Sequence, residues 1–120
     1  MSSEEGKMEL QEIINSLSLE VKTPELDLHR EVTGGYVSDL LSDVIANSQK
    51  NNIWVTLQIH LNIIAVASLK ELAGIILVNN RNPDADTLKK ANAENIPVMT
   101  STLPTFELVG RLYALGLRCR

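Results

Sequence analysis

Three apolar runs of the sequence are each followed by uncharged polar residues whose side chains can bind a ligand. The runs are 53–57, 74–78 and 96–99. Amide, hydroxyl and imidazole groups offer hydrogen-bond donors and acceptors to a polar or phosphorylated molecule. The candidate ligand-binding residues at these positions are Gln58, His60, Asn79, Asn80, Ser101 and Thr102.

His60 and the two asparagines each have two interpretations. His60, flanked by Gln58 and Asn62, can bind a phosphate or a base edge, or it can donate a hydrogen bond to a backbone carbonyl and hold its loop. Asn79 and Asn80 can recognise a polar ligand through their amides, or they can adopt the left-handed backbone conformation of a turn. The sequence favours neither interpretation.

A second group of candidate ligand-binding residues is Thr33, Gly34 and Gly35. The glycine pair predicts a turn that can adopt positive φ and approach another group closely. A helix is predicted to follow, with Ser38 as its N-cap. The amides at such a helix N-terminus can receive an anion, although the same arrangement also makes a tight connection from strand to helix without any ligand.

The motifs of phosphoryl transfer and hydride transfer are absent. The one Gly-Lys pair, Gly6-Lys7, lacks the glycine spacing of a P-loop, and G-x-G-x-x-G does not occur. His29, His60 and Cys119 are the only soft metal ligands, and no two of them have a chelating spacing. No nucleophile has a recognisable base partner. The sequence therefore predicts no catalytic residue, no metal and no cofactor, and a protein that is not an enzyme.

Two pairs of carboxylates lie close together in the sequence. Asp39 and Asp43 are one helical turn apart and can in principle hold Mg²⁺ together with the phosphates of a ligand. A solvated helix face explains this pair more simply. Asp84 and Asp86 fall in the first turn of a predicted helix, where negative charge suits the helix dipole. Neither pair is therefore counted as a metal site.

The charge and composition of the chain exclude several classes of partner. Its 11 Lys and Arg are scattered among 15 Asp and Glu, and only four residues are aromatic. Nucleic-acid binding needs a basic patch or a stacking platform, so we expect no nucleic-acid partner. The longest strongly apolar stretch, 61–69, is far shorter than the ~20 residues of a membrane helix, so we expect no membrane partner. A lone cysteine and an N-terminus without signal-peptide features favour a cytoplasmic protein.

The spacing of the apolar runs predicts the fold that positions the candidate residues. Segments long enough for a helix separate the runs, which is typical of β-α-β units with a parallel sheet. Ligands bind beyond the carboxyl ends of such strands, so we expect all the candidate residues to converge at one edge. We predict a single α/β domain with a mostly parallel sheet of about four to five strands and helices on both faces.

The remaining segments complete this predicted domain. Residues 1–16 are predicted to form an N-terminal helix packed on an α/β domain of residues 17–120, which begins with a strand over 17–21. The pattern from Pro24 to Val32 fits either a short strand or a loop. The last helix is predicted to have Thr105 as its N-cap and Gly116 as its C-terminal stop. Its inward-facing residues are predicted to be Phe106, Val109, Leu112, Tyr113 and Leu115.

Residues 61–72 are apolar on nearly every side, which is typical of an element buried on more than one face. In a chain of this size, the second buried face predicts a symmetric homodimer. We interpret the segment as a helix, and a strand over 63–69 is the alternative.

Most of the chain, from about Leu17 to Leu117, resembles a DRTGG domain. The resemblance is carried by EVTGGYVSDLLSDVIAN (31–47), AGIILVNNRNPDADTLKKANAENIPVMTS (73–101) and TFELVGRLY (105–113). The Thr-Gly-Gly of the name-giving pentapeptide is kept at 33–35, whereas Glu31 and Val32 replace its Asp and Arg. In this respect the chain is more similar to stand-alone members than to those fused to enzymes.

This resemblance implies an α/β fold similar to the N-terminal domain of bacterial HPr kinase/phosphorylase. It also implies an accessory or regulatory role, because DRTGG domains are attached to phosphotransacetylases and to CBS-domain pyrophosphatases. It supplies neither catalytic residues nor an established ligand. The resulting prediction is a non-catalytic, homodimeric sensor of a small polar or phosphorylated metabolite, nucleotides included. The alternative is a structural or assembly subunit that docks on a partner enzyme without a small-molecule ligand.

Overall fold

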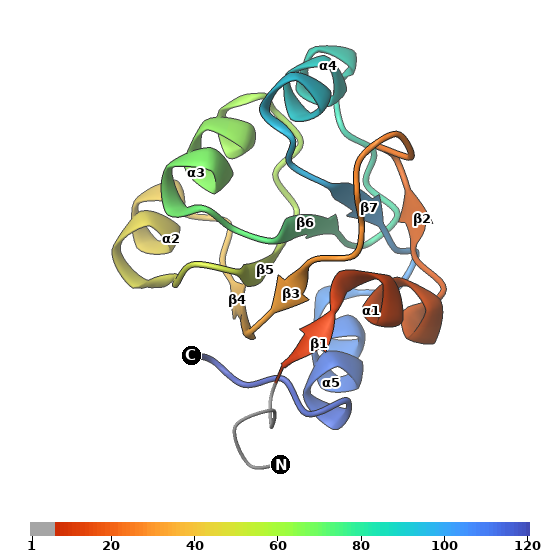
Figure 1. Cartoon of the computed structure of the whole chain (residues 1–120). Coiled ribbons are helices and arrows are strands. Elements are labelled where there is room, and N and C mark those ends of the chain that lie inside the picture. The colour runs from red at the N-terminus through yellow and green to blue at the C-terminus, as the bar shows by residue number, and fades with distance from the viewer. Residues whose placement is uncertain (1–6) are drawn as a thin grey trace.

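A five-stranded sheet lies at the centre of the fold, as Figure 1 shows for the computed structural model, which describes residues 7–120. Its strands lie in the order β2-β7-β6-β5-β4. β2 (Glu20–Val21) is antiparallel to β7. The other four run parallel: β4 (Gly34–Val37), β5 (Asn52–Thr56), β6 (Gly74–Leu77) and β7 (Val98–Thr100). The predicted fold class is therefore confirmed.

Helices cover both faces of this sheet (Figure 1). One face is covered by α2 (Leu41–Asn47), α3 (Asn62–Lys70) and α4 (Ala85–Glu94). The other is covered by α1 (Leu10–Leu17) and α5 (Thr105–Ala114). A separate antiparallel pair, β1 (Met8–Glu9) and β3 (Glu31–Val32), adjoins α1. Within residues 7–120, no helix is both long and apolar enough to cross a membrane.

The central strands β5 and β6 are the easiest to recognise in the sequence, because both of their faces are buried and their residues are therefore almost all apolar. Side chains alternate along a strand, so Ile75 and Leu77 of β6 pack towards α2, α3 and α4, whereas Ile76 packs towards α1 and α5. Strands covered on both faces read as continuous apolar runs. This is the physical reason why three short runs sufficed to predict the sheet.

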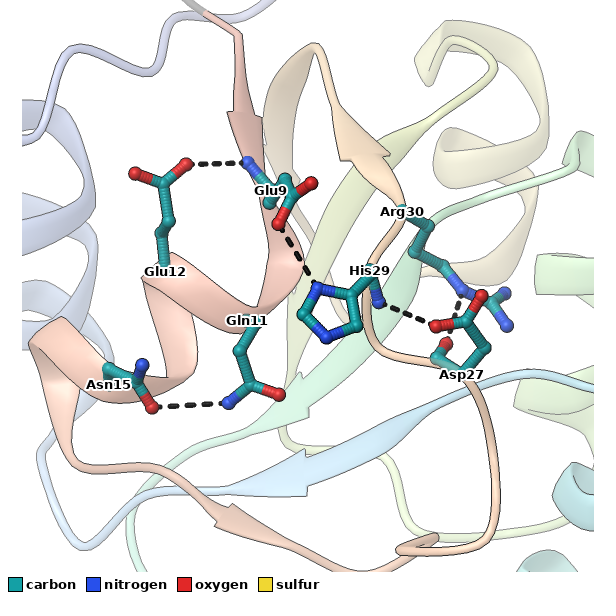
Figure 2. Close-up of polar contacts among 7 residues, drawn as sticks. All are labelled: Glu9, Gln11, Glu12, Asn15, Asp27, His29 and Arg30. Carbon is teal, nitrogen blue, oxygen red and sulfur yellow. Dashed lines mark hydrogen bonds and ion pairs between the residues drawn. The ribbon is translucent and has the colours of Figure 1, made fainter.

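The predicted N-terminal helix exists, but it is shorter than 1–16. Residues 1–6 of that prediction lie outside the described residues, and β1 precedes the helix. The start is fixed where the carboxylate of Glu12 accepts a hydrogen bond from the amide of Glu9 at 3.0 Å (Figure 2). At the other end Leu17 still belongs to α1 and Ser18 is left-handed, with φ 53°. The predicted strand over 17–21 is consequently reduced to β2.

The segment from Pro24 to Val32 is a loop that ends in β3. The carboxylate of Asp27 accepts a hydrogen bond from the amide of His29 at 2.9 Å, and its carbonyl accepts one from Arg30 Nε at 2.9 Å. His29 Nδ1 also lies 3.2 Å from the Glu9 carboxylate, as Figure 2 shows. These contacts attach the loop to the start of α1. His29 therefore has a structural role.

The predicted glycine turn at Thr33–Gly35 is wrong, because Gly34 and Gly35 belong to the extended strand β4 and neither has positive φ. Gly34 allows a close approach instead. A Cβ at Gly34 would lie 2.5 Å from the carbonyl oxygen of Arg118 and 2.8 Å from that of Arg120. The amide of Gly35 donates to the same Arg118 carbonyl at 3.0 Å. The glycine pair therefore accommodates the C-terminal segment beside the edge strand.

Within the segment 61–72 the structure forms helix α3 over Asn62–Lys70, as predicted, and the alternative of a strand over 63–69 is wrong. The apolar residues on several sides of α3 are covered by α2, by α4 and by the sheet, because α3 is the middle helix of its layer. Only Leu61 and Leu69 of its large apolar residues stay exposed. The burial that led us to predict a homodimer thus has an explanation within one chain.

The prediction that Phe106 and Tyr113 face the core is also wrong. α5 buries Leu108 and Leu112, whereas Phe106 is 91% exposed and Tyr113 is 58% exposed. Gly116 does follow the helix, and its φ of 111° is one that L side chains rarely adopt. α5 therefore carries two apolar faces, one of which points to solvent.

Candidate functional site

At the carboxyl ends of β6 and β7 the chain leaves the sheet towards opposite faces. The chain leaves β6 towards α4 on one face and leaves β7 towards α5 on the other face. Connections that diverge to opposite faces open a crevice between the two strand ends, and ligands of parallel sheets bind in such crevices. Asn79, Asn80, Ser101 and Thr102 all lie in these two connections.

Backbone hydrogen bonds fix the two connections to each other. The amide of Asn79 donates to the carbonyl of Leu103 at 2.7 Å, and the amide of Asn80 donates to that of Ser101 at 2.9 Å. Both asparagines have φ 59°, so the turn interpretation holds for them. Ser101 Oγ accepts a further bond from the amide of Leu103 at 3.1 Å. The crevice is thereby rigid at its base.

A polar pocket of about 370 Å³ opens beside these connections, between α1, β2 and α5. It brings together three of the predicted residues, Asn80, Ser101 and Thr102. Thr100 and Leu103 flank two of these residues in the sequence, whereas the other lining residues come from α1, β2 and α5 and had no local sequence signal. The remaining lining residues are Ser16, Leu17, Ser18, Glu20, Thr100, Leu103 and Arg111.

Two charged side chains set the electrostatics of this pocket. Arg111 is half exposed and pairs only loosely, with its Nε 3.7 Å from a Glu107 carboxylate oxygen. Glu20 is paired more closely, with its carboxylate 3.0 Å from Lys22 Nζ. A guanidinium next to several hydroxyl groups suits a phosphate or carboxylate group. The negative charge of the Glu20 carboxylate disfavours the binding of an anion. The Lys22 ammonium offsets part of the Glu20 charge.

Gln58 belongs to a different cluster, at the ends of β4 and β5. Its amide nitrogen donates to the carbonyl of Asp39 at 2.9 Å. The carboxylate of Asp39 accepts from the Thr56 hydroxyl at 2.8 Å and from the Leu57 amide at 2.7 Å. Asp39 precedes α2 and is not one helical turn from Asp43 on a shared helix. This network uses Gln58 and Asp39 to join the two strand ends.

His60 pairs with a carboxylate rather than with the backbone carbonyl that one interpretation anticipated. Its Nδ1 lies 2.9 Å from an oxygen of Asp84, the N-cap residue of α4, and both side chains are exposed. Thr87 of α4 also donates its hydroxyl to the carbonyl of Ile59 at 2.7 Å. The loop before α3 is thus tied to the start of α4. Neither Gln58 nor His60 lines the polar pocket.

Thr33, Gly34 and Gly35 do not converge with the other candidates, so this part of the prediction is wrong. Gly34 pairs with Asn52, the first residue of β5, which places the glycines at the amino-terminal end of the parallel strands. The hydroxyl of Thr33 donates to the carbonyl of Lys50 at 3.2 Å. The candidate residues at the carboxyl ends of the strands therefore lie in two separate clusters. Thr33, Gly34 and Gly35 belong to neither cluster. Among residues 7–120, no three metal-ligating side chains lie together.

Tyr36 and Asp43 form a hydrogen-bonded pair that makes stability depend on pH. The Tyr36 hydroxyl and the Asn47 amide each donate to Asp43 Oδ1 at 2.8 Å. These bonds hold the pKa of the Asp43 carboxyl below its ordinary value. The bond to Asp43, followed by burial, raises the pKa of Tyr36. Asp43 therefore contributes stability that is lost as pH falls through its lowered pKa, and Tyr36 contributes stability that is lost as pH rises through its raised pKa.

We expect Tyr36→Phe to lower the urea midpoint of unfolding most between about pH 4 and pH 10, the interval bounded by the ordinary pKa values of the two groups. The difference from wild type should shrink as the pH falls through the lowered pKa of Asp43. Tyr113→Phe is the matched control, because the exposed Tyr113 hydroxyl makes no such bond and the midpoint should not change. A difference for Tyr36→Phe that stays constant from pH 7 down through the acid unfolding range would contradict this account.

Comparison with known proteins bears on the fold. No protein-family model and no curated protein matches the sequence. The structure is similar to that of the CBS and DRTGG domains of the regulatory region of Clostridium perfringens pyrophosphatase, complexed with activator, diadenosine tetraphosphate. The TM-score is 0.71 over 92% of this chain, with 19% identity. This chain spans about half of that chain, 48% of its length. The likeness establishes a shared fold, which is consistent with the DRTGG-like fold that the sequence resemblance implied.

Proposed function

We propose that this chain is a non-catalytic regulatory module that binds a small anionic metabolite, with nucleotides as the first class to test. The polar pocket between α1, β2 and α5 is its binding site. Binding there would link the connections that follow β6 and β7 to α1 and α5, the two helices of one face. Occupancy would thereby favour one arrangement of α1 and α5, which is how a ligand acts as a signal.

The observation that carries this proposal is the placement of Arg111. The residue comes from α5, yet it lines the same pocket as Asn80 and Thr102, which follow β6 and β7. An exposed cation with a loose partner, beside hydroxyl and amide groups, can form charge-assisted hydrogen bonds to a phosphate. The pocket volume of about 370 Å³ falls in the range of small-molecule sites.

The solved structure of similar fold supports the proposal at the level of its class. That structure is a regulatory region, and it is complexed with a nucleotide activator. A regulatory role and an anionic ligand are therefore reasonable inferences for this chain. The DRTGG resemblance points to the same role.

Thermal unfolding with AMP, ADP, ATP, diadenosine tetraphosphate and sugar phosphates tests the proposal. A ligand at 100 times its dissociation constant should stabilise the protein by about 2.7 kcal/mol. Arg111→Gln should weaken the affinity about tenfold to 100-fold, because it removes a charged hydrogen bond. Glu20→Gln should strengthen the affinity, because it removes the opposing carboxylate.

Lys89→Gln is the matched control for loss of one positive charge, because Lys89 is an exposed residue of α4 outside the pocket. It should leave the affinity unchanged. Absence of stabilisation by every compound, or equal weakening by Arg111→Gln and Lys89→Gln, would contradict binding at this pocket.

The alternative proposal is an assembly subunit that docks on a partner enzyme. Exposed Phe106 and exposed Tyr113 favour it, because they lie two turns apart on one side of α5, and contiguous exposed apolar surface is characteristic of contact sites. The segment 61–72, which we first expected to form such a surface, is mostly buried within the chain. Copurification with one defined enzyme, combined with no response to metabolites, would favour this function over the first.

A further inference from the structure

The sheet face that carries α1 and α5 is covered less completely than the opposite face, which carries three helices (Figure 1). α5 lies against β5, and the chain that follows α5 returns to the edge strand β4, where the amide of Gly35 donates to the carbonyl of Arg118. Side chains alternate along a strand, so Val37 of β4 shares this face with its partner Val55 of β5. Val55 is fully buried, whereas Val37 is 42% exposed. The sheet is therefore open on this face at β4.

A cavity of about 320 Å³ occupies this open corner, between β4, β5, α5 and residues 117–119. Its wall is largely apolar and includes Val37, Val55, Val109, Leu112 and Leu117. The volume falls in the range of small-molecule sites. Cavities with an apolar wall hold water poorly and bind apolar molecules instead. The cavity is therefore suited to the apolar part of a ligand.

One charged residue, Arg118, belongs to the wall, and it is the only charged one among the described residues that line the cavity. Its guanidinium stacks 3.7 Å from the centre of the Tyr113 ring. Its Nη1 donates to the carbonyl of Tyr113 at 2.9 Å and to that of Leu117 at 2.8 Å. These contacts involve the ring plane and one nitrogen, so they fix the orientation of the guanidinium.

The Nε and Nη2 atoms of Arg118 keep their hydrogen-bonding capacity. Within residues 7–120, neither atom has a hydrogen-bond or ion-pair partner. This side of a guanidinium can bind both oxygens of a carboxylate through two parallel hydrogen bonds. Arg118 and Tyr113 are both exposed, so the guanidinium lies where the cavity meets solvent.

An apolar cavity with one oriented guanidinium at its open side selects a molecule with two parts. A hydrocarbon chain gains free energy when it leaves water for the cavity. A carboxylate at the end of that chain can bind Arg118 and remain partly hydrated. Such a ligand differs from the polar metabolites that we propose for the pocket between α1, β2 and α5.

We propose that the cavity between β4 and α5 is a second binding site, which holds the hydrocarbon chain of a small aliphatic carboxylate while Arg118 binds the carboxylate group. This inference goes beyond the proposed function. It rests on residues that the polar pocket does not contain, so either site can fail its test while the other stands.

Calorimetric titration of the full chain with hexanoate, heptanoate and octanoate tests the site, with each compound below its micelle concentration. Each added methylene should raise the affinity about fourfold until the cavity is full. Octylamine has the same chain and a positive charge, so it should bind more weakly than octanoate. An affinity that is independent of chain length, no binding of octanoate, or equal binding of octylamine would overturn the proposal.

Arg118→Gln tests the contact with the carboxylate. It should weaken octanoate binding about tenfold, because a charge-assisted hydrogen bond is lost. It should leave the binding of octanol, which has no charge, unchanged. Lys89→Gln on α4 is the matched control for loss of one positive charge and should change neither affinity. An equal loss for octanol and octanoate in Arg118→Gln would show that the arginine only supports the wall.

Val109→Trp tests the location of the site by filling the cavity from α5. Val109 is half-buried, so the chain should stay folded, as its thermal midpoint will show, and it should no longer bind octanoate or octanol. Ala114→Trp is the matched control, because Ala114 is exposed on the same helix and does not line the cavity. Full octanoate affinity in a folded Val109→Trp variant would overturn the proposal.

The thiol of Cys119 provides a second readout in the wild-type protein, because this residue lines the cavity and is the only cysteine of the chain. Octanoate should slow its alkylation by iodoacetamide in proportion to occupancy, whereas an unchanged rate at saturation would contradict binding in this cavity. Vesicles of phosphatidylglycerol distinguish a free carboxylate from a lipid. Binding to the vesicles without any binding of octanoate would assign the cavity to a membrane lipid and overturn the proposal.

Discussion

Replacing Trp54 with alanine is expected to lower the free energy of unfolding by about 3–5 kcal/mol. Trp54 is fully buried in the core beneath α2 and α3, and its indole nitrogen donates to the carbonyl of Ser38 at 2.8 Å. The substitution therefore creates a cavity and removes the bond that holds the connection from β4 to α2. Urea unfolding followed by circular dichroism measures the effect.

Trp54→Phe separates the two contributions. It keeps most of the buried volume but leaves the Ser38 carbonyl without its donor, so we expect a smaller loss of about 1–3 kcal/mol. A loss below about 1 kcal/mol for Trp54→Ala would mean that the core between the sheet and the α2, α3 and α4 layer does not depend on this residue.

Gly34→Ala is expected to cost about 1–3 kcal/mol, the range for overpacking in a tight site. The new Cβ would lie 2.5 Å from the Arg118 carbonyl oxygen, so either β4 or the C-terminal segment must move. Digestion by carboxypeptidase should accordingly be faster than in wild type. Urea unfolding measures the loss of stability.

Gly35→Ala and a truncation complete this test. A Cβ at Gly35 would lie 3.5 Å from Ile53 Cγ2, an ordinary contact, so the cost should be much smaller. In a chain that ends at Leu117, Gly34→Ala should add little further destabilisation, because the clashing carbonyls are gone. If Gly34→Ala lowered the free energy of unfolding equally in the shortened chain, the clash with the C-terminal segment would not be the reason for the glycine.

The sequence predicted the sheet well because its signals are local. β5 and β6 are buried on both faces, so their apolar runs are unbroken and their ends are visible as polar residues. The parallel direction of the strands followed from the helix-length segments between them, whereas the order of the strands came only from the structure. The turn conformation of Asn79 and Asn80 was one of two interpretations, and their backbone geometry decided it.

The errors concern contacts between segments far apart in the chain. Gly34 is needed by the C-terminal segment 84 to 86 residues later, a relation that no local pattern reveals, so a strand glycine was mistaken for a turn glycine. Phe106 and Tyr113 were expected in the core because an apolar helix face does not indicate whether its cover is the same chain. Arg111 entered the pocket from α5, and nothing near Ser101 or Thr102 in the sequence pointed to it.

The most direct test of the account is to map ligand binding by nuclear magnetic resonance with ¹⁵N-labelled protein. Diadenosine tetraphosphate and ATP are the probes, and each is titrated to several times its dissociation constant. We predict that the amide signals which shift belong to Asn80, Ser101, Thr102 and the α5 turn around Arg111, and that Arg111→Gln suppresses these shifts. Shifts confined to Thr33–Gly35 at the opposite edge of the sheet, or none at millimolar ligand, would contradict the proposed site.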